Sequence, residues 1–584
     1  MISISKTANQ LENLTNFPNH FLCMKLLVSQ SANVFKMPHL LIFRTHEIGY
    51  SQSQFETSSD MTRILSFLSI FILLVSSSSS ESFSGKFIQC LYLNSPPQIP
   101  ISEIVYTPRN SSYTVILEST IENLRFSSPI TPKPLIIVTP LVDSHAQATV
   151  ICCKQHGLQV RIRSRGHDYE GLSYTAGLPF ILLDLQFLHS ISIDVEENTA
   201  WVEAGATLGE VYYAIAEKSL VHGFPAGLCP LVGVGGHFSG GGFGTILRKY
   251  GLAADNIIDA HVVDPDGRIL DRESMGEGLF WAIRGGGAAS FGVVLSWKIK
   301  LVYVPPIVTV FNIAKTLDKN ATKLVHKWQY VAHKLDKNLF IRLVIEAAKV
   351  TFDSMFLGKA DELLEIMEDG FPELGLKSSD CMEMDWIGSV LYFSKYPNGT
   401  TIEALKERTP QEKISFKGTS DYVMDPIPEE GLEKLWKWCL EEENSMLIMD
   451  PYGGRMSEIS ESEIPFPHRK GNLFNIQYVV SWDDDGIVGS QKHIDWIRRV
   501  YEHMTPYVSK SPRAAYLNYR DLDLGRNVNN DTSYAEAARW GVKYFKGNFR
   551  RLAIVKGKID PHNFFAFEQS IPPLISNEGM REIE

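Results

Sequence analysis

Apolar runs alternate with amphipathic stretches from Pro134 onward, and this alternation predicts strands and helices in turn. The apolar run 135–138 predicts a buried strand. Ser144 is expected to cap a helix that Gly157 ends, and 159–163 is expected to form the next strand. The pattern is typical of an α+β nucleotide-binding region.

The same pattern continues to about Leu301. Thr207 and Glu210 have the spacing of a capping box and predict a helix start. Residues 257–263 and 291–301 read as strands, and Pro265-Asp266-Gly267 predicts a turn between them and later structure.

Pro305-Pro306 marks a boundary between this region and a second domain. The second domain mixes amphipathic helices at 360–368 and 432–443 with a β-rich stretch at 473–482. In the tail, from 515 to 573, we expect a strand, a helix near 534–549 and a proline-terminated end. The sequence therefore predicts a nucleotide-binding domain at 87–304, a second domain at 305–511 and a C-terminal segment at 512–575.

The pattern near the N-terminus predicts a secretory signal peptide at 61–80. Met61-Thr62-Arg63 supplies a positive start, 64–75 an apolar segment too short to span a bilayer, and 76–80 a serine-rich end. A buried core helix is the alternative. Because a signal peptide should begin the chain, residues 1–60 are interpreted as an upstream or artefactual extension.

Composition supports a secreted globular protein. The chain has 584 residues and a formal net charge of −11, which argues against nucleic acid or an anionic membrane as the main partner. Seven cysteines allow one or two disulfides. Cys153, Cys381 and Cys439 fit equally well as small buried side chains. Glycosylation sequons begin at four asparagines, Asn110, Asn320, Asn398 and Asn530.

Two glycine-rich loops carry the candidate chemistry, at 163–169 and at 229–244. Glycine lets backbone N–H groups approach an anion closely, because no Cβ intervenes. Each loop also holds one residue able to form a covalent bond, His167 and Cys229. One such loop could be a simple turn, but a third run at 284–287 favours a cofactor cradle. Neither a dinucleotide fingerprint nor a zinc motif is present.

These loops resemble the two signatures of the berberine bridge enzyme-like flavoproteins, which are plant secreted FAD-linked oxidases. The resemblance extends through 279–287, 451–454, 465–469, 516–523 and 569–573, so it covers nearly everything from Phe87 to Pro573. It implies an α+β fold of the vanillyl-alcohol-oxidase (PCMH-type) FAD-binding class. An inserted α+β substrate domain, an antiparallel sheet covered by helices, would occupy 305–511, and 512–575 would complete the FAD domain and active site.

The resemblance implies a bicovalent FAD, with His167 bonded to the 8α-methyl group and Cys229 to C6 of the flavin. It also implies a disulfide between Cys90 and Cys152. The cofactor cradle implied by the same motifs consists of Arg163, Ser164, Arg165, Gly166, Gly235, Gly236, His237, Ser239, Gly240 and Gly244.

Arg165 departs from the family pattern, which usually has glycine there. An arginine could pair with the FAD pyrophosphate. It could instead strain a turn that needs a positive φ, and attachment at His167 would then suffer.

Tyr519 resembles the family's proton acceptor for alcohol oxidation. A phenol with a pKa near 10 needs a neighbouring cation for this task, and His468, Arg520 and Arg165 are the candidates. We expect Tyr169, Tyr516 and Gln477 to orient the substrate. Asn475 and Gln477 stand on a strand where alkaloid- and cannabinoid-oxidising relatives carry a carboxylate, which favours plain alcohol or hemiacetal oxidation.

Val232 matches the position where valine leaves room for O2 in the family, so we expect an oxidase that releases H2O2. Asn475 and Gln477 supply neutral hydrogen bonds and favour the anomeric carbon of an oligosaccharide as substrate, and monolignol-type allylic alcohols are the alternative. We expect a monomer of the cell wall without a membrane span. Two other classes stay open: a hydrolase with Ser290 as nucleophile, and a flavoprotein whose catalysis Arg165 impairs.

Overall fold

The computed structural model describes residues 84–575, apart from 410–412, 484–485 and 529–531. The predicted signal peptide at 61–80 and the segment 1–60 lie outside the described residues. None of the helices in the described ranges is long and apolar enough to cross a lipid bilayer.

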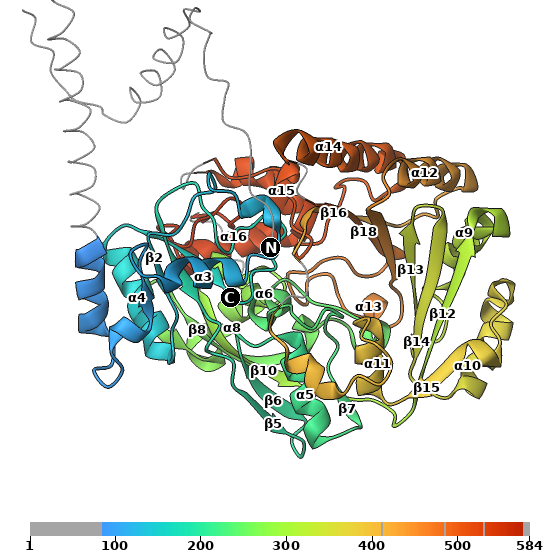
Figure 1. The fold of residues 1–584 in the computed structure, drawn as a ribbon, viewed down its shortest axis with the longest axis horizontal. Coiled ribbons are helices and arrows are strands. Elements are labelled where there is room, and N and C mark those ends of the chain that lie inside the picture. Colours follow the sequence, from blue (N-terminus) through green and yellow to red (C-terminus); the bar gives the residue numbers. More distant parts are fainter. Residues whose placement is uncertain (1–83, 410–412, 484–485, 529–531, 576–584) are drawn as a thin grey trace, which may run out of the picture. The chain divides into compact units, whose positions relative to one another are not determined.

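A four-stranded sheet begins the nucleotide-binding region (Figure 1). Its order is β1 (Val105–Tyr106), β2 (Ile136–Val138), β4 (Phe180–Asp184) and β3 (Gln159–Arg163). The last three are parallel, and β2 and β4 are wholly buried. Their apolar runs are those of strands covered on both faces.

Helix α4 (Asp143–Gln155) joins β2 to β3 and corrects one prediction. The expected cap at Ser144 is wrong, because the helix already begins at Asp143 and no side chain caps it. Instead, His145 reaches back and its Nδ1 accepts a hydrogen bond from the backbone N–H of Leu141. The predicted end is confirmed, since Gly157 follows the helix with a φ of +63°.

A second, antiparallel sheet follows along the chain. Its order is β5 (Ile191–Asp194), β6 (Thr199–Glu203), β10 (Val293–Lys300), β8 (Ile257–Val263) and β9 (Ile269–Leu270). Between β6 and β8, the capping box of Thr207 and Glu210 starts helix α5 (Leu208–Lys218) as predicted. Residues of both sheets and of α8 (Arg272–Ile283) share one apolar core.

A seven-stranded antiparallel sheet occupies the right side of Figure 1. Its order is β15 (Cys381–Met384), β12 (Val308–Thr316), β14 (Lys349–Phe356), β13 (Leu339–Glu346), β17 (Ser445–Pro451), β18 (Phe474–Trp482) and β16 (Ser415–Val423). Four helices cover one face, α9 (Ala321–Val331), α10 (Ala360–Gly370), α12 (Glu429–Glu441) and α14 (Gly486–Met504). Sheet and helices enclose a second apolar core.

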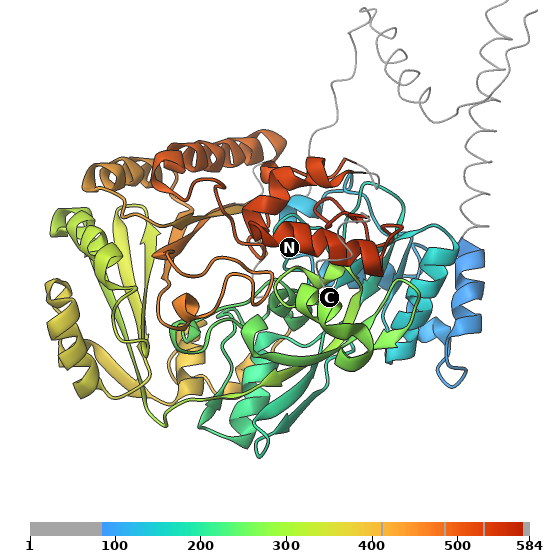
Figure 2. The ribbon, with the colours of Figure 1, turned by 180° about the vertical axis from the view of Figure 1, so that it is seen from behind.

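The C-terminal segment returns to the first core, and Figure 2 shows its red helices lying against green parts of the chain. The helix predicted near 534–549 begins at Tyr534 as expected but ends earlier, at Phe545. Lys546, with a φ of +46°, separates α15 (Tyr534–Phe545) from α16 (Asn548–Ile559). The strand predicted from 515 is wrong: the backbone N–H of Tyr516 bonds the Ser420 side chain rather than a strand partner.

The disulfide implied by the resemblance is present in the structure. Cys90 and Cys152 are joined, which links the helix at 84–94 to α4. Of the remaining cysteines with open roles, Cys153 and Cys439 are buried and Cys381 is partly exposed.

Candidate active site

A cavity of about 480 Å³ lies where the two halves of the fold meet, a size typical of cofactor and ligand sites. One part of its wall comes from the glycine loops and from the end of β3. The other part comes from Arg342 on β13, Ile448 on β17, Gln477 on β18 and the segment 516–520. The cavity therefore joins the predicted cofactor loops to the predicted substrate residues.

Most predicted site residues line this cavity. They are Ser164, Arg165, Gly166, His167, Tyr169, Cys229, Val232, Gly235, Gly236, His237, Ser239, Gly240, Gln477, Tyr516 and Tyr519.

Three predicted residues do not line the cavity. Arg163 is fully buried and pairs with Asp184 at 2.6 Å, so it is part of the core. A Cβ at Gly244 would lie 2.1 Å from the carbonyl oxygen of Ala226, so this glycine serves packing. Asn475 is buried, and its amide donates to the Asp421 carbonyl at 3.0 Å.

The loop of His167 turns at Gly166 and not at Arg165. Gly166 has a φ of +76°, and a Cβ there would lie 1.9 Å from the carbonyl oxygen of Thr120. Arg165 has no positive φ, so the predicted strain at this residue is wrong. Its buried side chain donates a hydrogen bond to the Arg408 carbonyl. The departure from glycine is therefore accommodated without backbone strain.

His237 supports the second loop from within. Its Nε2 accepts a hydrogen bond from the backbone N–H of Gly227 at 2.9 Å. Burial lowers the pKa of His237 to about 4, so its imidazole is neutral and can accept this bond. Cys229 is a free cysteine whose side chain is exposed, and it lines the cavity.

The cavity wall fits a flavin dinucleotide. Four residues of the lining have a buried polar atom without a hydrogen-bond partner among the described residues: Arg161 Nε, Arg165 Nε, His167 Nε2 and Ser173 Oγ. Because buried polar groups are normally satisfied, such atoms fit a bound polar ligand, although His167 Nε2 also faces the Glu122 carboxylate at 3.9 Å. The guanidinium of Arg165 suits an anionic ligand such as a pyrophosphate, whereas Arg161 already pairs with Glu568 at 2.8 Å.

Three tyrosines gather at the other part of the cavity. Tyr169 and Tyr519 stack with ring centroids 5.8 Å apart, and Tyr516 meets Tyr519 edge to face at 4.9 Å. Gln477 donates a hydrogen bond to the Tyr169 hydroxyl. Tyr516 is held in turn, because its hydroxyl accepts from the Gly242 backbone N–H at 2.8 Å.

Burial raises the pKa of Tyr519 well above its ordinary value, with Asp450 and Tyr169 adding to the rise. The cation that opposes this is Arg342, which pairs with Asp450 Oδ1 at 2.7 Å. Sequence reasoning missed Arg342. The available signal was an arginine between buried apolar residues of a strand, Ile341 and Leu343.

The three cations proposed from the sequence have other partners. His468 stacks on Tyr422, and burial lowers its pKa well below its ordinary value, so it is neutral. Arg520 pairs with Asp168 at 2.8 Å. Arg165 is not among the groups that shift the pKa of Tyr519.

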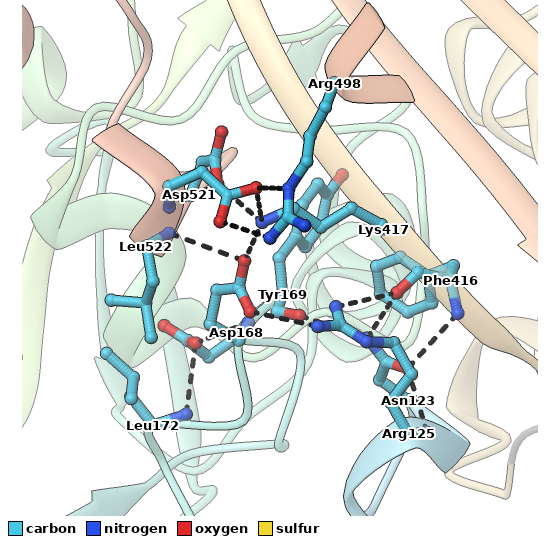
Figure 3. Close-up of polar contacts among 12 residues, drawn as sticks. Asn123, Arg125, Asp168, Tyr169, Leu172, Phe416, Lys417, Arg498, Asp521 and Leu522 are labelled. Atoms are coloured by element: carbon cyan, nitrogen blue, oxygen red, sulfur yellow. Dashed lines mark hydrogen bonds and ion pairs between the residues drawn. The ribbon is translucent and has the colours of Figure 1, made fainter. Parts of the chain in front are cut away.

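Lys417, on β16, is the centre of a buried charge cluster beside Tyr169 (Figure 3). Its side chain is 4% exposed and its Nζ pairs with Glu170 and, at 2.5 Å, with Asp521. Glu170 directly follows Tyr169, and Asp521 lies two residues after Tyr519. One ammonium group therefore holds both segments that carry the stacked tyrosines.

The hydrolase interpretation finds no support. The Ser290 side chain accepts a hydrogen bond from the Ile571 backbone N–H at 3.2 Å. Within the described residues, no hydrogen bond connects a histidine to Ser290, and an activated serine needs such a base.

Comparisons with known proteins identify the family of the chain. A family model described as FAD binding domain matches residues 134–272, and one described as berberine and berberine like matches residues 515–572. The chain is 54% identical over 519 residues to tetrahydroberberine oxidase of Berberis wilsoniae, covering 86% of this chain and 97% of that protein. It is 50% identical over 530 residues to a monolignol oxidoreductase of Arabidopsis thaliana, covering 88% and 98%.

A solved structure matches as well. Phl p 4, a grass pollen allergen with glucose dehydrogenase activity, has a TM-score of 0.81 at 47% identity, covering 84% of this chain and 100% of that one. A variant of it, with valine in place of one isoleucine, is described as a glucose oxidase. These matches confirm the predicted FAD-binding fold and an FAD-linked oxidoreductase activity.

Proposed function

The chain belongs to the berberine bridge enzyme-like family of FAD-linked oxidoreductases, and from this we propose that it oxidises an alcohol or hemiacetal carbon with O2 as final acceptor. One observation carries the proposal: His167 and Cys229 line the same cavity as Tyr519, Tyr169 and Gln477. The residues expected to attach the flavin and those expected to meet the substrate therefore share one enclosed space.

FAD would be held by two covalent bonds, one to His167 and one to Cys229, with Arg165 near its anionic part. When bound, FAD supplies the hydride acceptor. Cys229 suits attachment because it is free, exposed and not in a disulfide. Surrounding protein raises the pKa of its thiol, so the thiolate forms at the moment of reaction rather than beforehand.

Tyr519 would accept the substrate's hydroxyl proton. Its pKa is raised by burial, so the phenolate must be stabilised locally, and Arg342 is the cation that lowers this pKa. Because phenolate is the active form, activity should increase with pH. The hydrogen bond from Gln477 orients Tyr169, which packs against Tyr519 and forms the other side of the substrate position.

The lining favours a neutral aromatic alcohol. The side chains at this part of the cavity are largely aromatic, including Phe243, Tyr516 and Tyr519. Asp168 is the one acidic residue among the described lining residues, and it pairs with Arg520, so a cationic amine finds no free carboxylate. The monolignol oxidoreductase at 50% identity agrees with this substrate class.

A carbohydrate hemiacetal is the second candidate. The sequence argument for it used both Asn475 and Gln477, and only Gln477 reaches the cavity. In its favour, the structural neighbour Phl p 4 has glucose dehydrogenase activity, and aromatic walls also bind sugars.

O2 would reoxidise the flavin, because Val232 in the cavity wall leaves space that leucine would fill. The grass allergen variant in which valine makes a glucose oxidase supports the idea that one side chain sets oxygen use. In an active preparation, Val232→Leu should slow reoxidation by O2 and leave substrate-driven reduction unchanged. Equal reoxidation rates would exclude this role of Val232.

The test of function is a peroxide-release screen with three substrate groups: monolignols, cello- and galacturono-oligosaccharides, and tetrahydroprotoberberine amines. Monolignols should give the highest kcat/KM, and Tyr519→Phe should lose most of it. Highest activity on the amines would overturn the substrate assignment, and flavin bleaching without peroxide would overturn the oxidase assignment.

Secretion to the cell wall, after removal of the signal peptide at 61–80, is part of the proposal. Two observations favour it: the disulfide, and the exposure of the sequon residues Asn110, Asn320 and Asn398. Asn530 lies outside the described residues. N-terminal sequencing of the native protein should begin after residue 80, and a start before Met61 would contradict the interpretation of 1–60.

A further inference from the structure

Glu122 and His167 form a buried pair that the function above does not use. Glu122 Oε1 lies 3.9 Å from His167 Nε2. Neither atom has a hydrogen-bond partner among the described residues, and both are shielded from solvent. Two facing, unsatisfied polar atoms of opposite character suggest a hydrogen bond that forms when the imidazole is fixed in place.

The surrounding backbone holds the two residues together. Gly166 presses against the carbonyl oxygen of Thr120, where a Cβ would come within 1.9 Å. On the other side of Glu122, the Asn123 amide donates to the carbonyls of Tyr169 and Phe416, at 3.0 and 2.9 Å. These contacts flank the pair on both sides, and Figure 3 shows Asn123 beside Tyr169 and Phe416. Backbone packing and hydrogen bonds of the neighbouring residues therefore keep Glu122 close to His167.

His167 is a neutral imidazole in this environment. Burial, together with the positive charge of Arg165, lowers its pKa to about 4, against a backbone contact with Leu231 that raises it. Neutral imidazole has one N–H and one free lone pair. An acceptor beside Nε2 favours the proton at that atom, so the lone pair lies on Nδ1. Burial raises the pKa of Glu122, and the ammonium of Lys413 and the guanidinium of Arg165 oppose this rise by favouring the carboxylate.

We propose that Glu122 is the positioning residue for attachment of the flavin to His167. It holds the proton at Nε2, fixes the ring and makes Nδ1 the nucleophile; this rests on the histidyl link of the proposed function. In the net step, one N–C bond replaces a methyl C–H bond of the flavin and the N–H bond of His167. The two electrons and two protons released are taken by O2, which becomes H2O2.

The pair also gives Arg165 a role. Its charge compensates Glu122 and keeps His167 unprotonated, so the arginine supports attachment instead of hindering it. A purely structural Glu122 that only neutralises Arg165 would predict a different result, because its loss would then alter stability and not the rate of attachment.

The experiment uses the Cys229→Ser background, in which His167 alone can hold the flavin. Full-length protein produced with little riboflavin is mixed with FAD, and samples are precipitated with acid at timed intervals. Flavin fluorescence of the protein band measures covalent attachment, and flavin in the supernatant measures FAD bound without a covalent bond. The variant is Glu122→Gln, and the matched control is Glu118→Gln, an exposed glutamate four residues earlier.

Glu122→Gln should slow attachment at least about tenfold, as expected for losing a group that positions a proton, while non-covalent FAD binding persists. Glu118→Gln should match the background. Equal attachment rates in all three proteins would overturn the role of Glu122, as would loss of all FAD binding in Glu122→Gln. If the Cys229→Ser background alone releases its flavin in acid, then the histidyl link of the proposed function fails instead.

Discussion

Replacing Lys417 by methionine removes the one positive charge between Glu170 and Asp521 while keeping a similar side-chain length. Burial alone lowers the pKa of Lys417, but Asp521, Glu170 and Asp523 outweigh this effect and raise it, so the native lysine is charged. Its side chain and those of Glu170 and Asp521 are 4 to 5% exposed. The methionine variant therefore leaves the Asp521 carboxylate without its counter-ion and Glu170 with Arg125 alone, 3.6 Å away.

Breaking a buried ion pair by removing one partner costs about 3 to 5 kcal/mol. We expect Lys417→Met to lose stability within that range, because Asp521 loses its cation and Glu170 keeps only Arg125. Lys417→Arg retains the charge and should lose much less. The assay is denaturant unfolding of the purified proteins, followed by tryptophan fluorescence.

The pH dependence separates charge from packing. In the methionine variant, the stranded carboxylates have folded pKa values raised above their unfolded ones. Such groups destabilise the fold as pH rises, because ionisation then favours the unfolded chain. The stability difference between Lys417→Met and the native protein should therefore be small at mildly acidic pH and large at mildly alkaline pH. A difference that stays constant with pH would refute the electrostatic reasoning.

Three further predictions address the site. Arg342→Gln should lower kcat and shift the rise of kcat to higher pH, because the cation favouring the Tyr519 phenolate is lost. Arg342→Lys should keep the native pH profile, and an unchanged profile in the glutamine variant would exclude this role of Arg342. Arg165→Gly should raise the pKa of His167. In the Cys229→Ser background, flavin attachment should therefore be slower than in the background protein at mildly acidic pH and equal to it at neutral pH. A difference that does not depend on pH would count against the charge effect. His237 has a pKa of about 4 in the folded protein against 6.5 when free. Its stabilising contribution is therefore complete above pH 6.5 and falls by up to about 3 kcal/mol as the pH drops towards 4. His237→Gln, which can still accept the hydrogen bond from Gly227, should flatten this part of the curve of stability against pH, and an identical slope would show that other groups cause it.

Local patterns predicted the elements well where one interaction dominates. The capping box of Thr207 and Glu210 depends on residues three apart, and the structure confirms it. The cap at Ser144 failed because the helix begins one residue earlier, at Asp143, with Val142 at the N-cap position and no side-chain cap. The strand expected from 515 failed because its apolar residues serve the cavity wall and tertiary hydrogen bonds, which resemble a strand pattern in sequence.

The candidate site was predictable where motif residues act through their own loop, as for His167 and Cys229, which line one cavity. It was not predictable where function depends on contacts between distant segments. Arg342 approaches Tyr519 from strand β13, far away in the sequence, and the pairing of Glu122 with His167 depends on tertiary packing. Asn475 is a predicted site residue that the fold removes from the cavity: its amide donates to the Asp421 carbonyl, whereas Gln477 on the same strand lines the cavity.

The most direct test of the account is peptide mapping of the purified native protein by mass spectrometry after acid denaturation and proteolysis. The account predicts one FAD-derived group joined to two peptides, one containing His167 and the other Cys229. Quantitative release of FAD on denaturation, with both peptides unmodified, would contradict it.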